Sequence, residues 1–155
     1  MTSMTRNVLL VEDDENDIFL FKRAMKLAGW TDPLQVVHDG KQAIDYLSGS
    51  EQFSRRDEFP MPVLVLLDLK LPYVNGLEVL KWIRDHPSFK QLAVVMVTSS
   101  REEVDVERAC RLGANAYVVK PGAAEELVDL VKAIWGFWIK HNQFCSNGTV
   151  LSCNP

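Results

Sequence analysis

Short apolar runs alternate along the chain with longer stretches in which apolar residues recur at helical spacing. Residues 63–67 are apolar throughout, as expected for a strand that is buried on both faces. Residues 17–29 place Ile18 and Met25 on one helical face and end at Gly29, a residue that commonly stops a helix. The pattern predicts strands at residues 7–11, 34–37, 63–67, 93–97 and 116–119 and helices at residues 17–29, 41–47, 76–86, 101–112 and 123–140.

Five strands separated by five helical patterns predict parallel crossovers and a doubly wound α/β sandwich. In such sheets, binding sites form beyond the carboxyl ends of the strands, near the point where the strand order reverses. The residues that follow four of the predicted strands are Glu12-Asp13-Asp14, Asp68, Thr98-Ser99 and Lys120-Pro121.

Composition narrows the class of protein further. The 155 residues are expected to form one domain, and a share of 47% apolar and 25% charged residues excludes a disordered chain. No apolar run approaches the roughly 20 residues of a membrane helix, so no membrane partner is expected. A formal net charge of −4 argues against a nucleic-acid partner, because phosphate contacts need a basic face.

Cellular location is inferred from the N-terminus and the cysteines. Residues 1–7 are polar and lack the hydrophobic region of a secretion signal, so we expect a cytoplasmic protein. Cys110, Cys145 and Cys153 fit a reducing compartment better than a disulfide framework. Cys145 and Cys153 flank Asn147-Gly148, a hairpin turn signal, which leaves open a bridge between them.

The residues at the carboxyl edge of the sheet form a chemically coherent set. Glu12, Asp13 and Asp68 would bring three carboxylates together, and like charges destabilise one another unless a cation neutralises them. Carboxylate oxygens with room for water suit Mg²⁺. Lys120 and the Thr98 hydroxyl would lie on the other side of the same pocket. A carboxylate nucleophile, a divalent metal, a cation and a hydroxyl donor are the parts needed to accept a phosphoryl group on an aspartate.

These residues also carry a family resemblance. The chain resembles the receiver domains of two-component response regulators over residues 7–140, which implies a flavodoxin-like fold with strand order 2-1-3-4-5 and a receiver domain at residues 1–140. The motifs that carry the resemblance are Leu10-Val11-Glu12-Asp13-Asp14, Leu66-Leu67-Asp68-Leu69-Lys70-Leu71-Pro72 followed by Gly76, Val97-Thr98-Ser99, and Gly113-Ala114-Asn115-Ala116-Tyr117-Val118-Val119-Lys120-Pro121.

The resemblance implies an acceptor and a set of metal ligands. Asp68 is similar to the family's phosphoacceptor, which takes a phosphoryl group from a phosphohistidine on a sensor histidine kinase. Glu12 and Asp13 are similar to its Mg²⁺ ligands, completed by Asp68 and the backbone carbonyl of Lys70, with Mn²⁺ as a substitute. The protein would then be a signalling phosphoacceptor that catalyses only its own phosphotransfer and dephosphorylation.

A switch is implied in the same way. Thr98 and Lys120 are similar to the groups that bind the phosphoryl oxygens, and Tyr117 matches the aromatic residue that turns inward when the threonine hydroxyl moves toward the phosphate. The bond between Lys120 and Pro121 is expected to be cis, as in the family.

A closer resemblance concerns the regulators partnered with phytochrome-type kinases. The long connection at residues 48–62, the Asp68 motif and Phe137-Trp138 at the end of the last helix are similar to single-domain regulators of that group, so a bacteriophytochrome kinase is an expected partner. The connection reads equally well as a partner contact or as a solvated surface loop.

The last helix carries more apolar residues than one sheet face can cover. Leu127, Val131, Ile134 and Trp138 form the expected core stripe, which Val128 and Ile139 widen. We expect a homodimer whose interface includes the residues Leu130, Trp135, Phe137 and Trp138.

The tail at residues 141–155 is expected to act as an exchanged arm in that dimer. The alternative is that it folds back over Trp135 in the same chain. Fifteen residues after the last helix are too few for an effector domain. Output is therefore expected through protein contacts or onward phosphotransfer.

Other classes remain as alternatives. An aspartate-nucleophile hydrolase would carry a second acid where this chain has Lys70. A nucleotide-binding protein would need a Gly, Ser or Thr loop in place of Glu12-Asp13-Asp14. A histidine phosphotransfer protein would be helical throughout. The main alternative is a degenerate receiver that acts as a phosphorylation-independent binding and dimerisation module, which would normally have lost Asp68, Thr98, Lys120 or an acid.

Overall fold

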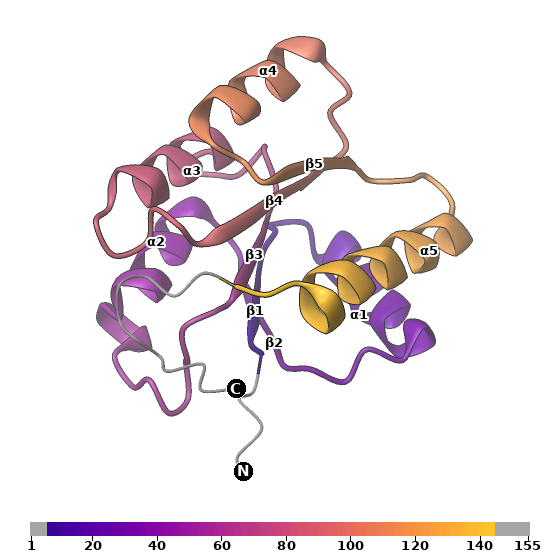
Figure 1. Ribbon diagram of the computed structural model, residues 1–155, viewed down its shortest axis with the longest axis horizontal. Helices are drawn as coiled ribbons and strands as arrows, with labels where there is room; N and C mark the ends of the chain where they lie inside the picture. Colours follow the sequence, from indigo (N-terminus) through magenta and orange to yellow (C-terminus); the bar gives the residue numbers. More distant parts are fainter. Residues whose placement is uncertain (1–5, 145–155) are drawn as a thin grey trace.

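The protein folds into a five-stranded parallel sheet covered by helices on both faces (Figure 1). The computed structural model describes residues 6–144. The strands pair in the order β2-β1-β3-β4-β5, as expected. They are β1 (Val8–Val11), β2 (Leu34–Val37), β3 (Leu64–Leu67), β4 (Ala93–Thr98) and β5 (Ala116–Val119). The helices are α1 (Glu15–Ala28), α2 (Gly40–Ser48), α3 (Gly76–Asp85), α4 (Glu103–Leu112) and α5 (Ala124–Ile134).

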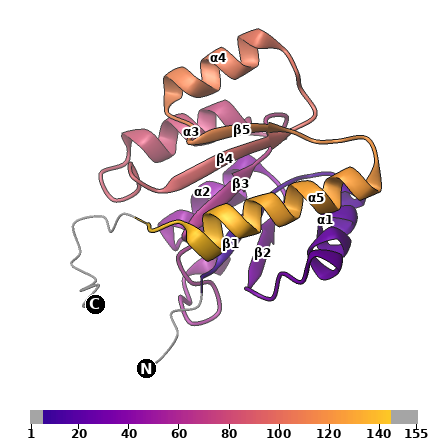
Figure 2. The same cartoon turned by 45° about the vertical axis from the view of Figure 1, so that its right-hand side comes forward.

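Two apolar layers hold the sheet between its helices. α1 and α5 pack on one face, and α2, α3 and α4 pack on the other, which the turned view makes clear (Figure 2). Along β1, Val8 and Leu10 join the α1–α5 layer, whereas Leu9 and Val11 join the opposite layer. Because successive strand side chains point to opposite faces, a strand covered on both sides must be apolar throughout.

Helix boundaries differ slightly from the expected ones, and the causes are local. α1 begins at Glu15 because the Asp14 side chain caps it, accepting a hydrogen bond from the backbone N–H of Asp17. It ends at Gly29, whose φ of 77° lies in the left-handed region that glycine adopts readily. Within the described part of the chain, no helix is both long enough and apolar enough to cross a membrane.

The end of the last helix corrects one expectation. The helix expected at residues 123–140 is α-helical only as far as Ile134, and a π-helical segment follows at Trp135–His141. The wider turn changes which side chains face the sheet, so Ile139 is buried, although its α-helical spacing assigned it to the flank of the apolar arc. Of the arm expected at residues 141–155, residues 145–155, with Cys145 and Cys153, lie outside the described residues.

The connection between α2 and β3 is anchored to the core at some residues, although many of its side chains are exposed to solvent. A 3₁₀ turn at Glu51–Phe53 brings the buried Phe53 ring to 5.1 Å from that of Tyr46 and 5.2 Å from that of Phe59. The Arg56 guanidinium donates hydrogen bonds to the carbonyls of Tyr46 and Leu47, both at 2.7 Å. The aromatic residues therefore anchor this segment to the core, and a role as a partner contact stays a prediction.

Candidate functional site

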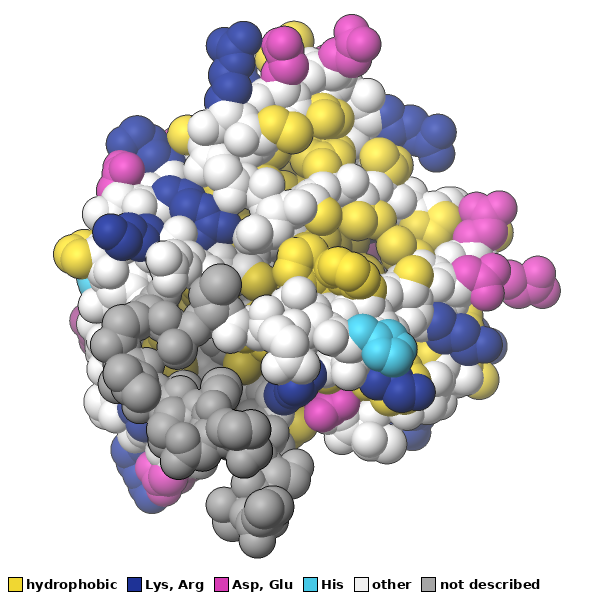
Figure 3. All heavy atoms as spheres, viewed as in Figure 1, with side chains coloured by type: hydrophobic (Ala, Val, Ile, Leu, Met, Phe, Trp, Pro, Cys, Tyr) yellow, Lys and Arg dark blue, Asp and Glu magenta, His cyan; other side chains and the backbone are white. Residues whose placement is uncertain are grey.

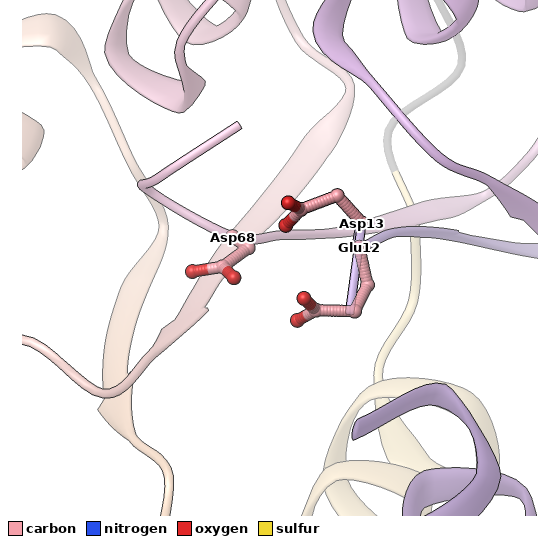
Figure 4. A group of neighbouring side chains, drawn as sticks. All are labelled: Glu12, Asp13 and Asp68. Atoms are coloured by element: carbon pink, nitrogen blue, oxygen red, sulfur yellow. The ribbon is translucent and has the colours of Figure 1, made fainter. Parts of the chain in front are cut away.

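Three carboxylates meet where β1 and β3 end. Val11 pairs with Leu67 in the parallel register, so the residues that follow, Glu12 and Asp68, leave the sheet side by side. Carboxylate oxygens of Glu12, Asp13 and Asp68 lie within 4.8 Å of one another. Figure 4 shows these side chains pointing toward a common space from the two strand ends. Glu12 and Asp68 are buried and Asp13 is exposed, so the cluster opens to solvent on one side.

Lys120 closes the opposite side of this cluster. It follows β5, and its backbone N–H donates a 2.8 Å hydrogen bond to the Thr98 carbonyl at the end of β4. The Lys120 ammonium donates to the carboxylates of Glu12, Asp68 and Asp17, with Nζ–Oδ2 distances of 3.2 Å to Asp68 and 3.1 Å to Asp17. Lys120 lies at this edge as its place after the fifth strand predicts, whereas no pattern in the sequence points to Asp17, which lies in the first turn of α1.

Burial and neighbouring charges shift the pKa values of Glu12 and Lys120. Burial raises the pKa of Glu12 to about 7, and the charge of Asp68 adds to the rise, while hydrogen bonds from Lys120 and the Asp14 backbone N–H oppose it. Burial lowers the pKa of Lys120, but the hydrogen bond to Glu12 and the charge of Asp68 outweigh it, so the pKa stands above its ordinary value. Lys120 is therefore a permanent cation at neutral pH.

The Asp68 carboxylate has two differently placed oxygens. Its Oδ1 accepts a 2.7 Å hydrogen bond from the Leu69 backbone N–H, and its Oδ2 faces Lys120. Gly76, the first residue of α3, packs directly on this backbone, because a Cβ there would lie 2.1 Å from the Asp68 carbonyl oxygen. The Gly76 backbone N–H donates to the Leu69 carbonyl at 2.8 Å. The close approach of α3 therefore sets the position of Asp68.

Thr98 and Tyr117 meet around the segment that follows β4. Thr98 is buried, and its hydroxyl oxygen accepts a long 3.4 Å hydrogen bond from the Ser100 backbone N–H. The half-buried Tyr117 donates a 2.9 Å hydrogen bond from its hydroxyl to the Ser100 carbonyl. The two expected switch residues thus bind the same residue, one on each side of its backbone.

The structure contradicts the cis bond expected before Pro121 and leaves the metal-binding role of Lys70 untested. No cis peptide bond occurs among residues 6–144, so the expected cis bond before Pro121 is wrong for this structure; the hydrogen bonds of the Lys120 backbone and ammonium orient the side chain without it. Lys70 lies two residues beyond Asp68 with an exposed side chain, and the part of its backbone carbonyl in metal binding stays a prediction.

The residues expected at a dimer interface differ in how far their own chain covers them. Trp135 is half-buried within its own chain, where its indole N–H donates a 3.1 Å hydrogen bond to Asp32 and the Lys140 ammonium lies over its ring. Phe137 is 58% exposed and packs edge-on against Trp138, with ring centroids 5.1 Å apart. Leu130 is half-buried. Trp135 therefore has a partner in its own chain, whereas Phe137 does not bury its ring.

Similarity to known proteins agrees with this geometry. The family model described as "Response regulator receiver domain" matches residues 8–132. Two curated relatives are FilR2 of Methanothrix harundinacea, described as a probable methanogenesis regulatory protein and 37% identical over 136 residues (88% of this chain, 85% of the relative), and the response regulator Rcp1 of Synechocystis sp., 35% identical over 133 residues (86% and 88%).

Solved structures give the same result. The Mn²⁺-bound form of Rcp1 superposes with a TM-score of 0.81 at 32% identity, over 91% of this chain and 99% of that chain. The phosphorylated cyanobacterial phytochrome response regulator RcpA superposes with a TM-score of 0.84 at 32% identity, with the same coverage. With the parallel sheet and the acidic cluster at its carboxyl edge, these similarities show that the chain belongs to the response regulator receiver domain family.

Proposed function

We propose that this receiver domain accepts a phosphoryl group on Asp68 from a phosphohistidine of a sensor kinase, in the presence of Mg²⁺. The observation that carries the proposal is the environment of Asp68, whose carboxylate lies 3.2 Å from the Lys120 ammonium and within 4.8 Å of the oxygens of Glu12 and Asp13. This environment combines a nucleophile, a cation and a set of hard oxygen ligands in one partly open site.

The acidic cluster fits a divalent cation. Glu12, Asp13 and Asp68 would supply carboxylate oxygens, the Lys70 backbone carbonyl would complete the protein ligands, and water and a phosphoryl oxygen would fill the remaining positions. A bound cation supplies positive charge that offsets the carboxylates and the phosphoryl oxygens. Mn²⁺ should substitute for Mg²⁺, since the related Rcp1 has a Mn²⁺-bound form.

The residues of this chain then have distinct tasks in the transfer. Asp68 Oδ2 provides the lone pair that forms the new O–P bond, while the P–N bond to the kinase histidine breaks and its electron pair returns to the imidazole. Lys120 is the cation beside this oxygen and stabilises the charge on the transferred group. The Thr98 hydroxyl would donate to a phosphoryl oxygen, and the hydrogen bond that it accepts from the Ser100 N–H, at 3.4 Å, is long enough to let the side chain turn. Tyr117 holds the Ser100 carbonyl and so links Thr98 to the surface of β5.

We propose two partners, a phytochrome-type kinase and a second copy of this chain. RcpA is a phytochrome response regulator, which supports a phytochrome-type kinase as the phosphoryl donor for this chain. Hydrophobic side chains gather over β5 between α4 and α5 (Figure 3). Val104 of α4 and Phe137, in the segment that follows α5, are more than half exposed. We expect this face to form a homodimer, with the tail at residues 141–155 as an exchanged arm. Phe137→Ser should shift sedimentation equilibrium toward the monomer; an unchanged mass would exclude Phe137 from the interface.

Intact-protein mass spectrometry tests the central proposal. Incubation with acetyl phosphate and Mg²⁺ should add one phosphoryl group to the wild-type protein, and the adduct should be absent from Asp68→Asn and after treatment with EDTA. A protein that gains no adduct and binds no beryllofluoride, a mimic of the phosphoryl group, would instead be a phosphorylation-independent binding module.

A further inference from the structure

The Lys120 ammonium has three carboxylate partners, one for each of its three N–H donors. Glu12 and Asp68 belong to the acidic cluster, whereas Asp17 belongs to α1 and lies outside it. The Asp17 backbone is itself held in place, because its N–H donates a 3.0 Å hydrogen bond to the side chain of Asp14. Asp17 is therefore a fixed anchor that joins α1 to the residue at the end of β5.

The three partners differ in what happens to them when the site is loaded. In the proposed reaction, the Glu12 carboxylate would bind the metal ion, and Asp68 would become an acyl phosphate whose carboxyl group no longer carries a negative charge. Both changes weaken the attraction that these two side chains exert on the ammonium. Asp17 is not among the expected metal ligands and does not carry the phosphoryl group. Its carboxylate therefore keeps its charge throughout the reaction.

We propose that Asp17 is a positioning residue that keeps the Lys120 ammonium beside the phosphoryl group once Glu12 and Asp68 no longer hold it. The inference rests on the proposed function of Asp68. Lysine has a flexible four-carbon side chain, so an ammonium held only by the phosphoryl oxygens would move more freely than one that Asp17 also binds. Nζ lies 3.1 Å from Asp17 and 3.2 Å from Asp68, so the contact with Asp17 is compatible with the contact that the phosphoryl group needs.

Calorimetric titration with beryllofluoride and Mg²⁺ tests this role. Asp17→Asn should bind the mimic on the order of tenfold more weakly than the wild type, as is typical when a residue that orients an active group is lost. Glu15→Gln is the matched control. Glu15 lies in the same first turn of α1 and is acidic, but it contacts His38 at 3.6 Å and its side chain is 83% exposed. The control should stay within about twofold of the wild type.

Two further variants separate positioning from a structural effect. Asp17→Glu keeps the carboxylate and should restore most of the binding. In a Lys120→Met background, Asp17→Asn should change the affinity by less than about twofold, because its action passes through the ammonium. Asp17→Asn should unfold at a somewhat lower temperature than Glu15→Gln, since it loses a partly buried ion pair, but it should remain folded at the temperature of the titration.

The outcomes distinguish the two proposals. If the wild type binds beryllofluoride and Asp17→Asn binds it as tightly as Glu15→Gln does, Asp17 has no positioning role. An equal loss in the Lys120→Met background would also overturn the role, because Asp17 would then act without Lys120. If the wild type itself does not bind beryllofluoride, the phosphoacceptor function fails, and the role of Asp17 fails with it.

Discussion

Gly76→Ala should disturb the stability of the fold and the metal site together. A Cβ at Gly76 would lie 2.1 Å from the Asp68 carbonyl oxygen and 2.9 Å from the Leu69 Cα. Optimal separations between nonbonded heavy atoms are about 3.5–4.0 Å, so the two segments must separate by more than about 1 Å. Both contacts are with backbone atoms, and no change of side-chain rotamer can relieve them.

The size of the effect follows from the cost of overpacking. Inserting a methyl group into a well-packed region typically costs about 1–3 kcal/mol, and a value near the middle of that range predicts a loss of about 2 kcal/mol. For a domain of this size, that loss lowers the melting temperature by roughly 4–8 °C. Because Asp68 itself must move, Mg²⁺ affinity should fall by about tenfold or more.

Urea unfolding and calorimetric Mg²⁺ titration measure the two effects, with Gly136→Ala as the control. Nothing lies within 4 Å of the position where a Cβ at Gly136 would stand, so this variant should bind Mg²⁺ like the wild type and be no less stable, since alanine favours a helical segment over glycine. The reasoning fails if Gly76→Ala unfolds with the same free energy as Gly136→Ala. It also fails in part if stability falls while Mg²⁺ affinity stays unchanged, since Gly76 would then not set the position of Asp68.

Three other predictions concern Lys120, Tyr46 and Lys70. Lys120→Met should lower the free energy of unfolding by about 3 kcal/mol in EDTA, because it leaves neighbouring carboxylates without their cation, and Mg²⁺ should restore part of it; equal stability with and without Mg²⁺ would contradict this. Burial raises the pKa of Tyr46 above 10.0, so the folded state keeps this proton to higher pH than the unfolded state does. The stability of the wild type should therefore fall relative to that of Tyr46→Phe as pH rises above about 10, and parallel urea-unfolding curves for the two proteins at pH values on either side would refute it. Lys70→Asn should change the lifetime of the phosphoryl group on Asp68, since Lys70 is exposed two residues beyond Asp68 and its cation would alter the attack of water on that group; identical decay rates would exclude that role.

The fold class and the strand positions could be predicted because each strand is a short, mainly apolar run between helical patterns, which is visible in the local sequence. The five observed strands begin and end within one residue of the expected positions. The acidic residues that follow β1 and β3 could also be assigned to one edge, since parallel strands bring their carboxyl ends together. The same rule assigns Lys120 to this edge, and the contact between its ammonium and Asp68 confirms that position.

Contacts between distant parts of the chain could not be predicted in the same way. Asp17 was not selected because an acid in the first turn of a helix is common, and only the packing of α1 beside the end of β5 brings it to Lys120. The pairing of Trp135 with Asp32 has the same origin. The burial of Phe53 was missed because the segment around it is charged, and the neighbouring rings that cover it are brought there by the fold.

Periodicity and strand-end chemistry thus define the α/β architecture, the acidic cluster and the family, because these depend on residues near one another in sequence or on one edge of one sheet. The hydrogen-bond partners of Lys120, the anchoring of the connection after α2 and the π-helical end of the last helix depend on which surfaces meet across the core. Which side chains meet at such contacts depends on how whole helices and strands pack against one another. The local pattern of hydrophobic and polar positions does not contain that information.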